Sequence, residues 1–510
     1  MSRIAWAGRY GTTKEGASSR RSFVTVFVLS LLISAFGETL AYTRAGFWGV
    51  VLISIIVVGL ILAKKRLLGI CLFFSVALNI SEYSRDITST TGFYSMRTVV
   101  FLGNSLAVWL LILTAGSSVL FLGRRKMSLL FANGFIGFWS LGMLWFVAVG
   151  AANCLWGGNP WSYFLTEVRL PVFILLSYVA VWCQPVAGQR WIATVLMTAV
   201  LARPFATTLA HLLSLTGTYG GVWDIATYAP LSFLGVAIFA LFFVGKQHVI
   251  PRWIVWLCVL AETYVLTFQP SGKDFFTLVI VILLGTMAGI KGQHAVIKVA
   301  GTLAVVVPVT LLVVSVFSQG RISPLAAEKI SQVLSLLRYG FRAVIDPKWA
   351  YAISASPQVR VLEFANIIRD LAQSMLGLLF GRGAGGSFSD WRYPFVFVGG
   401  AFSATEWNTG LFYWVHESLN FVLLKFGIVG LVVWFIAVLH LLRRLRAQRD
   451  TQQYFLALST VLIVLFMLGF SVQIQMFLGA ALGLAAMPSL TPLVPNAGTG
   501  RAAASALPGG

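Results

Sequence analysis

Long apolar runs separated by short polar connections dominate this chain. Runs such as 226–245 and 274–290 reach or approach the roughly 20 residues that cross a bilayer core. Backbone polar groups in lipid must hydrogen-bond within their own segment, so each run predicts a helix. The expected spans are 23–42, 46–63, 67–80, 98–122, 131–152, 168–183, 191–215, 226–245, 251–268, 274–290, 296–317, 418–442 and 453–470, with a short run at 476–487 as a further candidate. The pattern predicts an all-α polytopic transmembrane bundle of about 12–14 spans.

Composition excludes an ordinary soluble domain. Hydrophobic residues make up 58% of the 510 residues and charged residues only 10%, whereas soluble domains carry about 25% charged residues. The four cysteines have no metal-ligand spacing, so we expect neither a metal site nor a cofactor.

Positive charge orients the expected bundle. Basic clusters follow alternate spans, as at Lys64–Arg66 and Arg443–Arg449, whereas the opposite short connections hold only Arg44, Arg85, Arg97, Arg169 and Lys273. Because basic loops stay in the cytoplasm, the amino terminus is expected inside. The net charge of +21 then indicates contact with membrane lipids and not with nucleic acid.

The span pattern divides the chain into five parts. We expect a cytoplasmic segment at 1–22, a bundle of about 11 spans at 23–317, one large loop outside the cytoplasm at 318–417, C-terminal transmembrane helices at 418–487 and a disordered tail at 488–510.

The large loop has helical periodicity. Apolar residues recur at helical spacing over 330–341 and over 361–375, and Arg360, Glu363, Asn366, Asp370 and Gln373 occupy the other side of the second segment. Such amphipathic helices are able to lie on the bilayer surface and roof a cavity in the bundle. A small packed outer domain without a ligand is the alternative.

A glycine-rich stretch, GRGAGGSFSD at 381–390, follows the second helix. It fits G-x-G-x-x-G formally, but a dinucleotide fingerprint requires a preceding strand in a βαβ unit. Here the glycines are expected to end a helix and let backbone amides approach an anion.

His416 is the histidine expected at an outer membrane surface. An imidazole there is able to take a proton and to act as a general base. The alternative is a solvated interfacial side chain.

The surroundings of His416 resemble a known family. The string WVHESLNFVLLKFGIVGLVVWF at 414–435 is similar to the C-terminal motif of the O-antigen ligase and O-antigen polymerase superfamily. The stretches at 166–181, 268–289 and 357–386 resemble further motifs of that family in the same order along the chain. Two positions depart from the family: Glu417 stands where the family often has asparagine, and Lys273 stands where it has arginine.

The resemblance implies a metal-independent, GT-C-type glycosyltransferase that uses a glycan on undecaprenyl pyrophosphate. The preferred interpretation is an inverting polymerase of lipid-linked repeat units for O-antigen, capsule or exopolysaccharide. A ligase that transfers the glycan to lipid A-core or to protein is the alternative, and a flippase or secondary transporter is the rival from another class. A chain-length regulator or a flippase would be a further partner.

Displacement of pyrophosphate needs fixed cations, because negative charge develops on the leaving group. The candidates are Arg360, Lys273, Arg169 and Arg382, with His416 as the base and Glu417 or Glu363 as the group that orients or replaces it. The alternative for each arginine is a surface residue that snorkels or pairs with Glu363 or Asp370.

Two charges lie inside expected spans. Arg203 is expected to bind lipid phosphate or to pair with Glu262, because a central charge is costly in a bilayer. Lys425, early in the span at 418–442, is expected to snorkel outward.

Overall fold

The structure is a computed structural model that describes most of the chain outside 216–323. The described residues are 14–40, 44–79, 96, 99–120, 134–215, 324–396, 402–447, 451–466 and 472–486, with positions 251, 253–258, 260, 261, 277, 280, 281, 283 and 284. The spans expected at 226–245 and 296–317 therefore lie outside the described residues, and so do most of 251–268 and 274–290, with Glu262 and Lys273.

Apolar helices form the first part of the chain, close to the predicted spans. They are α1 (Lys14–Leu40), α2 (Arg44–Leu62), α3 (Arg66–Asn79), α5 (Leu106–Leu120), α7 (Gly134–Trp156), α8 (Trp161–Trp182) and α9 (Val186–Leu215). The helix expected from residue 98 begins only at Leu106, so its predicted start is wrong. A hairpin of β1 (Val100–Phe101) and β2 (Asn104–Ser105) precedes it, with positive φ at Leu102 (48°) and Gly103 (76°) in the turn.

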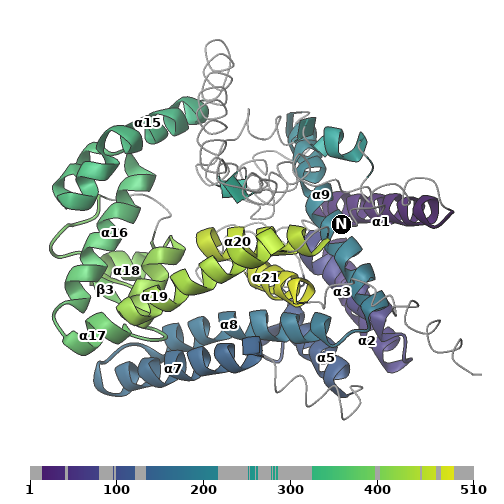
Figure 1. Ribbon diagram of the computed structural model, residues 1–510, viewed down its shortest axis with the longest axis horizontal. Coiled ribbons are helices and arrows are strands. Elements are labelled where there is room, and N and C mark those ends of the chain that lie inside the picture. Colours follow the sequence, from purple (N-terminus) through teal and green to yellow (C-terminus); the bar gives the residue numbers. More distant parts are fainter. Residues whose placement is uncertain are drawn as a thin grey trace, which may run out of the picture.

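A second group of elements forms a cap at one end of the bundle, shown in green on the left of Figure 1. We define the cap as residues 324–396 and 402–417. Its elements are α15 (Pro324–Ile345), the 3₁₀ helix η1 (Pro347–Ala352), α16 (Ala355–Leu371), α17 (Met375–Phe380), β3 (Phe388–Ser389), α18 (Ala404–Thr409) and β4 (Leu411–Phe412). The helices that the sequence predicts in this region are present, although the second breaks before Met375.

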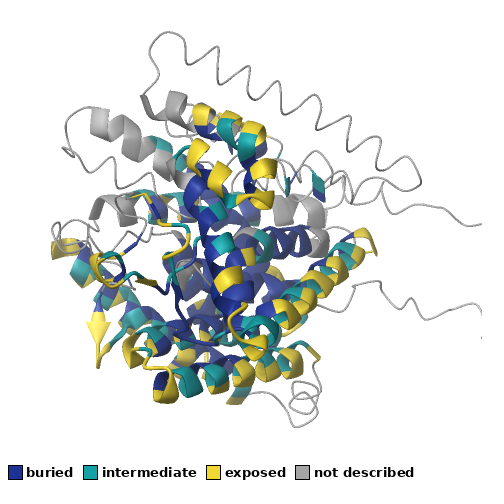
Figure 2. Ribbon diagram, turned by 90° about the vertical axis from the view of Figure 1, so that its left-hand side faces the viewer, coloured by how far each residue is buried: buried dark blue, intermediate teal, exposed yellow. Residues whose placement is uncertain are grey.

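The chain leaves the cap through α19 (Ser418–Ala447), α20 (Thr451–Phe466) and α21 (Val472–Ala485), which return into the bundle. In the described part, α2, α7, α8 and α19 are long and apolar enough to cross a membrane. Shorter apolar helices accompany them, and exposed residues cover the outer helical faces around a buried centre (Figure 2). The chain is therefore a mainly helical membrane protein, with the number of spans in the whole chain still a prediction.

Small residues bring the bundle helices close together. A Cβ atom at Gly479 of α21 would lie 2.2 Å from the carbonyl oxygen of Ile174 in α8, so only glycine fits there. On the other side of the bundle, the hydroxyls of Ser30 in α1 and Thr198 in α9 lie 3.0 Å apart within hydrogen-bond distance. Both contacts are typical of helix packing in membranes, where small and hydroxyl residues line the interfaces.

The polar side of α16 faces the interior of the cap. Glu363 and Asn366 are fully buried, whereas Ile368 on the apolar side is 37% exposed. Burial of these polar groups is tolerated because each has partners: Asn366, for example, bonds both the N–H and the carbonyl of Tyr393. In α16 the side with Glu363 and Asn366 therefore packs inward, and Leu371, which the pattern placed on the apolar side, is buried as well.

Candidate functional site

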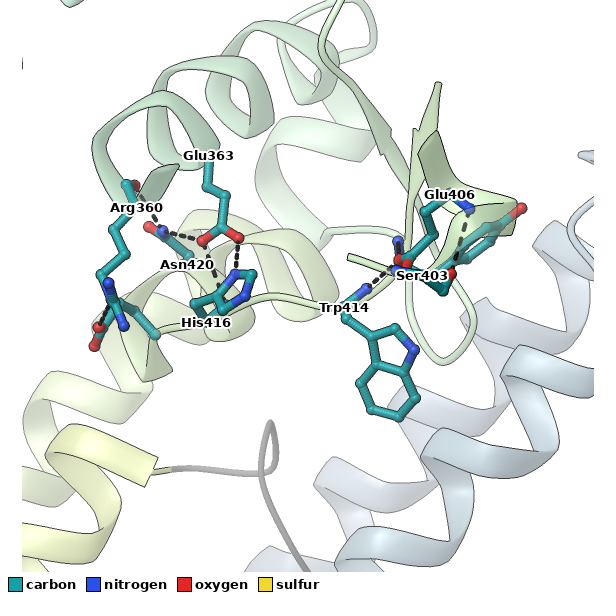
Figure 3. A network of polar contacts seen from close by, with 9 residues as sticks. Arg360, Glu363, Ser403, Glu406, Trp414, His416 and Asn420 are labelled. Atoms are coloured by element: carbon teal, nitrogen blue, oxygen red, sulfur yellow. Dashed lines mark hydrogen bonds and ion pairs between the residues drawn. The ribbon is translucent and has the colours of Figure 1, made fainter. Parts of the chain in front are cut away.

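His416 and Glu363 form the centre of the candidate site, as Figure 3 shows. Glu363 projects from α16, and His416 lies in the short connection between β4 and α19. The Nδ1 atom of His416 hydrogen-bonds one carboxylate oxygen of Glu363, and the backbone N–H of His416 donates to the other at 3.3 Å. One buried carboxylate thus fixes both the ring and the backbone of the histidine.

This contact sets the chemistry of the imidazole. A carboxylate accepts hydrogen bonds, so the neutral ring carries its proton on Nδ1 and presents a lone pair at Nε2. The His416 side chain is 23% exposed, while Glu363 is fully buried, and the ring of Phe402 packs edge-on against the imidazole at 5.1 Å between centroids. The arrangement leaves Nε2 free of this contact and holds the orientation of the ring with a buried acid.

Arg360 and Glu417 form an ion pair beside this centre. Arg360 lies about one helical turn before Glu363 on α16, and Glu417 follows His416 directly. The side-chain amide of Asn420 in α19 donates to the carbonyl of Arg360 at 3.1 Å and to Glu363 at 3.3 Å. Of the predicted site residues, the structure therefore brings four together: His416, Glu417, Glu363 and Arg360.

Glu406 fixes the connection that carries His416. It forms a capping box with Ser403 at the start of α18, and its Oε1 atom accepts the N–H groups of Tyr413 at 2.8 Å and Trp414 at 3.1 Å (Figure 3). Glu406 is fully buried. A carboxylate that holds two successive backbone amides leaves the segment before His416 little freedom.

Tyr413 also stacks on Tyr163 at the start of α8, with ring centroids 3.9 Å apart. Burial raises the pKa of the Tyr413 phenol, and the nearby Tyr163 adds to that rise. The phenol therefore stays protonated, and the ring pair joins the cap to the bundle.

A second polar centre lies deeper, between the cap and the bundle. The Nζ atom of Lys425 lies 2.6 Å from Oε1 of Glu167 in α8, and donates to the carbonyls of Gly386 at 2.7 Å and Tyr413 at 3.5 Å. Lys425 is fully buried. The expectation that Lys425 snorkels outward is therefore wrong, because Glu167 and the backbone of the glycine-rich stretch supply a polar pocket inside.

The glycine-rich stretch ends α17 as predicted, with Gly381 at φ 73°. Four successive backbone N–H groups of this stretch donate to neighbouring segments. Those of Arg382, Gly383 and Ala384 donate to the carbonyls of Leu424, Lys425 and Phe146 in that order, and that of Gly385 donates to the carboxylate of Glu167. Of these four amides, that of Gly385 meets an anion, and this anion is a side chain of the protein itself. The preceding element is a helix and not a strand, as expected for a stretch that is no dinucleotide fingerprint.

A break in α19 receives this stretch. Gly427 has φ 64° and ψ −160°, and a Cβ atom there would lie 2.5 Å from the carbonyl of Leu379. A Cβ atom at Gly381 would lie 2.4 Å from the backbone of Lys425 and Phe426. The two backbones therefore touch at paired glycines. The carbonyls just before the break, those of Leu424 and Lys425, accept hydrogen bonds from the backbone N–H groups of Arg382 and Gly383.

The remaining predicted cations lie in different surroundings. Arg382 bonds the carbonyl of Ser387 at 2.6 Å and lies 3.9 Å from the carboxylate of Asp370, so its guanidinium holds the glycine-rich stretch. Arg169 is exposed on α8, while the nearby Glu167 is buried. Arg203 is buried in α9, a helix that packs mainly on α1 and α3.

Sequence reasoning missed Glu167 and Glu406 as members of this region. A glutamate in the apolar run of α8 and a lysine in that of α19 were a usable signal, because opposite charges inside spans tend to pair.

Among the described residues, no group of three or more His, Cys, Asp or Glu side chains is placed to hold a metal ion. Comparisons with known protein families, with curated proteins and with solved structures give no match.

Proposed function

We propose that this protein is an inverting membrane glycosyltransferase that acts on glycans carried by undecaprenyl pyrophosphate. The observation that supports it best is the His416–Glu363 pair with the Arg360 guanidinium beside it, at the end of a membrane bundle. A base and a cation side by side suit a reaction in which a hydroxyl attacks and a phosphate group leaves.

In the proposed reaction, an acceptor hydroxyl attacks the anomeric carbon of the donor sugar. The new carbon–oxygen bond forms as the bond to the pyrophosphate oxygen breaks, which inverts the configuration. The hydroxyl proton passes to Nε2 of His416, and the buried carboxylate of Glu363 stabilises the imidazolium that results. Pyrophosphate leaves on its lipid with its added negative charge.

Arg360 is the best placed cation for that leaving group. Its guanidinium is 24% exposed and already holds a carboxylate, Glu417. A carboxylate and a phosphate group both present two oxygens that the planar guanidinium is able to bind. We propose that pyrophosphate takes the place of Glu417 on Arg360. Lys273 remains a proposed second cation, whereas Arg382 and Arg169 are less suited, because one holds the glycine-rich stretch and the other lies on an outward surface of α8.

The proposed setting is a bacterial inner membrane, with the amino terminus in the cytoplasm and the cap on the periplasmic side. There the polyprenyl chain of the donor stays in the bilayer while its sugars reach His416. Alternating basic connections support this topology, and Arg203 is then a candidate contact for lipid phosphate.

Analysis of lipid-linked glycans and surface polysaccharide in cells with and without the gene tests the proposal. Loss of long polymer with accumulation of single lipid-linked repeat units supports the polymerase that we propose. Accumulation of long lipid-linked polymer indicates a ligase instead. Unchanged lipid-linked and surface glycans would contradict both.

A further inference from the structure

The exposed side of α15 carries an apolar stripe that the described residues leave uncovered. Leu337 is 69% exposed, Phe341 80% and Ile345 72%, at the spacing that places them on one face of a helix. The opposite face, with Gln332 and Ala343, is buried against the cap. The helix therefore packs on the protein with one side and presents its most apolar side outward.

Two arginines follow one edge of this stripe. At about 100° per residue, Arg338 and Arg342 lie between the apolar stripe and the buried face, and both are exposed. Arg338 lies over the ring of Tyr339 at 5.2 Å, and Arg342 lies over the ring of Trp349 at 5.4 Å. These aromatic supports hold two positive charges at the border of an apolar surface.

The 3₁₀ helix η1, which packs on α15, carries aromatic residues of the interfacial type. Trp349 stacks on Tyr339 with centroids 6.2 Å apart and is 42% exposed. Tyr351 is 43% exposed, and its hydroxyl donates to the carbonyl of Pro394 at 2.9 Å. Tryptophan and tyrosine with an apolar body and a polar tip are enriched where membranes meet water.

The attachment of the cap connects this surface to a helix that is able to cross a membrane. The cap ends where α19 begins, and α19 is long and apolar enough to cross a membrane. Asn420 and Lys425, in the first turns of α19, bond to the cap directly. If α19 crosses the bilayer, the cap is therefore fixed to the end of that helix, where lipid headgroups would lie.

We propose that α15 docks on the bilayer that surrounds the protein, with its apolar stripe among the acyl chains and Arg338 and Arg342 on anionic phospholipid headgroups. A stripe of this kind with flanking cations is the pattern of interfacial helices. Each arginine near an anionic surface favours docking roughly fivefold. This inference stands whether or not the chain transfers glycans.

Spin labels on the full-length protein in nanodiscs test the docking. The four native cysteines are first replaced, and a nitroxide is attached after Phe341→Cys or, in a second variant, Leu337→Cys. Collision with oxygen, which concentrates in lipid, is compared with collision with a water-soluble nickel chelate. Asn408→Cys on exposed α18 serves as the control position.

We expect the labels at 341 and 337 to favour oxygen, and more strongly in nanodiscs that contain phosphatidylglycerol than in phosphatidylcholine alone. Arg338→Gln with Arg342→Gln should remove the dependence on phosphatidylglycerol. The matched pair Arg369→Gln with Arg392→Gln, which removes two exposed cap arginines outside α15, should keep it.

Three results would overturn the proposal. Labels that meet the nickel chelate as readily as the label at 408 would show that the stripe faces water. Labels shielded from both reagents would show that protein, such as a second copy of the chain, covers the stripe. A preference of the labels for oxygen that does not depend on phosphatidylglycerol would show that the two arginines do not bind anionic headgroups.

Discussion

Glu167 and Lys425 form a buried ion pair, with 2.6 Å between carboxylate oxygen and ammonium nitrogen, although they lie 258 positions apart in the sequence. Glu167 also accepts the amide of Gly385 at 2.6 Å, and Lys425 donates to the carbonyls of Gly386 and Tyr413. One pair of charges thus links α8, the glycine-rich stretch, the segment before His416 and α19. It fixes the cap to the bundle.

Removal of one partner should therefore destabilise the protein strongly. Lys425→Met leaves the Glu167 charge buried without its cation, at a cost of about 3–5 kcal/mol. Thermal unfolding of the purified protein in detergent should show a clearly lower Tm for this variant. The double variant Glu167→Gln with Lys425→Met should recover part of the loss, because no unpaired charge remains. An unchanged Tm for Lys425→Met would contradict the pair.

The glycine contact between Gly381 and Gly427 gives a second test of the same junction. Alanine at Gly427 adds a Cβ atom 2.5 Å from backbone and imposes the left-handed φ of 64° on a residue with a side chain. The strain alone costs roughly 1–2 kcal/mol, before the collision is counted. We expect Gly427→Ala to lower the Tm, as measured by thermal unfolding.

Gly59 in α2 is the matched control for that substitution. A Cβ atom there meets nothing within 4 Å, and alanine favours a helix over glycine. Gly59→Ala should therefore leave the Tm unchanged or slightly higher. Equal effects of the two substitutions would argue against a close backbone contact at the break in α19.

The pair of Arg360 and Glu417 predicts opposite effects on donor binding. Arg360→Ala removes the proposed pyrophosphate contact and should raise the KM for the lipid-linked donor, whereas Glu417→Gln frees the guanidinium and should lower it. Arg360→Lys should recover only part of the loss, because an ammonium group lacks the bidentate geometry. Initial-rate measurements against donor concentration give these values. If Arg360→Ala and Glu417→Gln both raise the KM for the donor, Glu417 has a direct role with the substrate and the proposed exchange is wrong.

The helices were the part of the fold that the sequence could predict best. Apolar runs located α2 and α3 closely at both ends, because hydrophobic length in a bilayer leaves few alternatives. The predicted start of α8 at 168 is wrong, because the helix begins at Trp161. The start of α5 was missed, since the Leu102–Gly103 turn depends on local backbone geometry and not on hydropathy.

The candidate site was predictable where its members lie on two short segments. Helical spacing put Arg360 and Glu363 on one side of α16, and His416 and Glu417 are adjacent in the sequence. The junction with Glu167 was not predictable in this way, because periodicity describes one helix at a time. Which face of α16 is buried also depends on partners, such as the backbone of Tyr393, that come from distant parts of the chain.

The central claim is that His416 is the base of a glycosyl transfer, and it is tested most directly by transfer with purified protein in liposomes that contain lipid-linked glycan. His416→Ala should lower the rate of transfer by about 10²–10⁴-fold, and Glu363→Gln should also lower it. The control His440→Ala, at an exposed histidine of α19, should leave the rate unchanged. Comparable Tm values must show that the variants are folded. Full transfer by a folded His416→Ala variant would contradict the account.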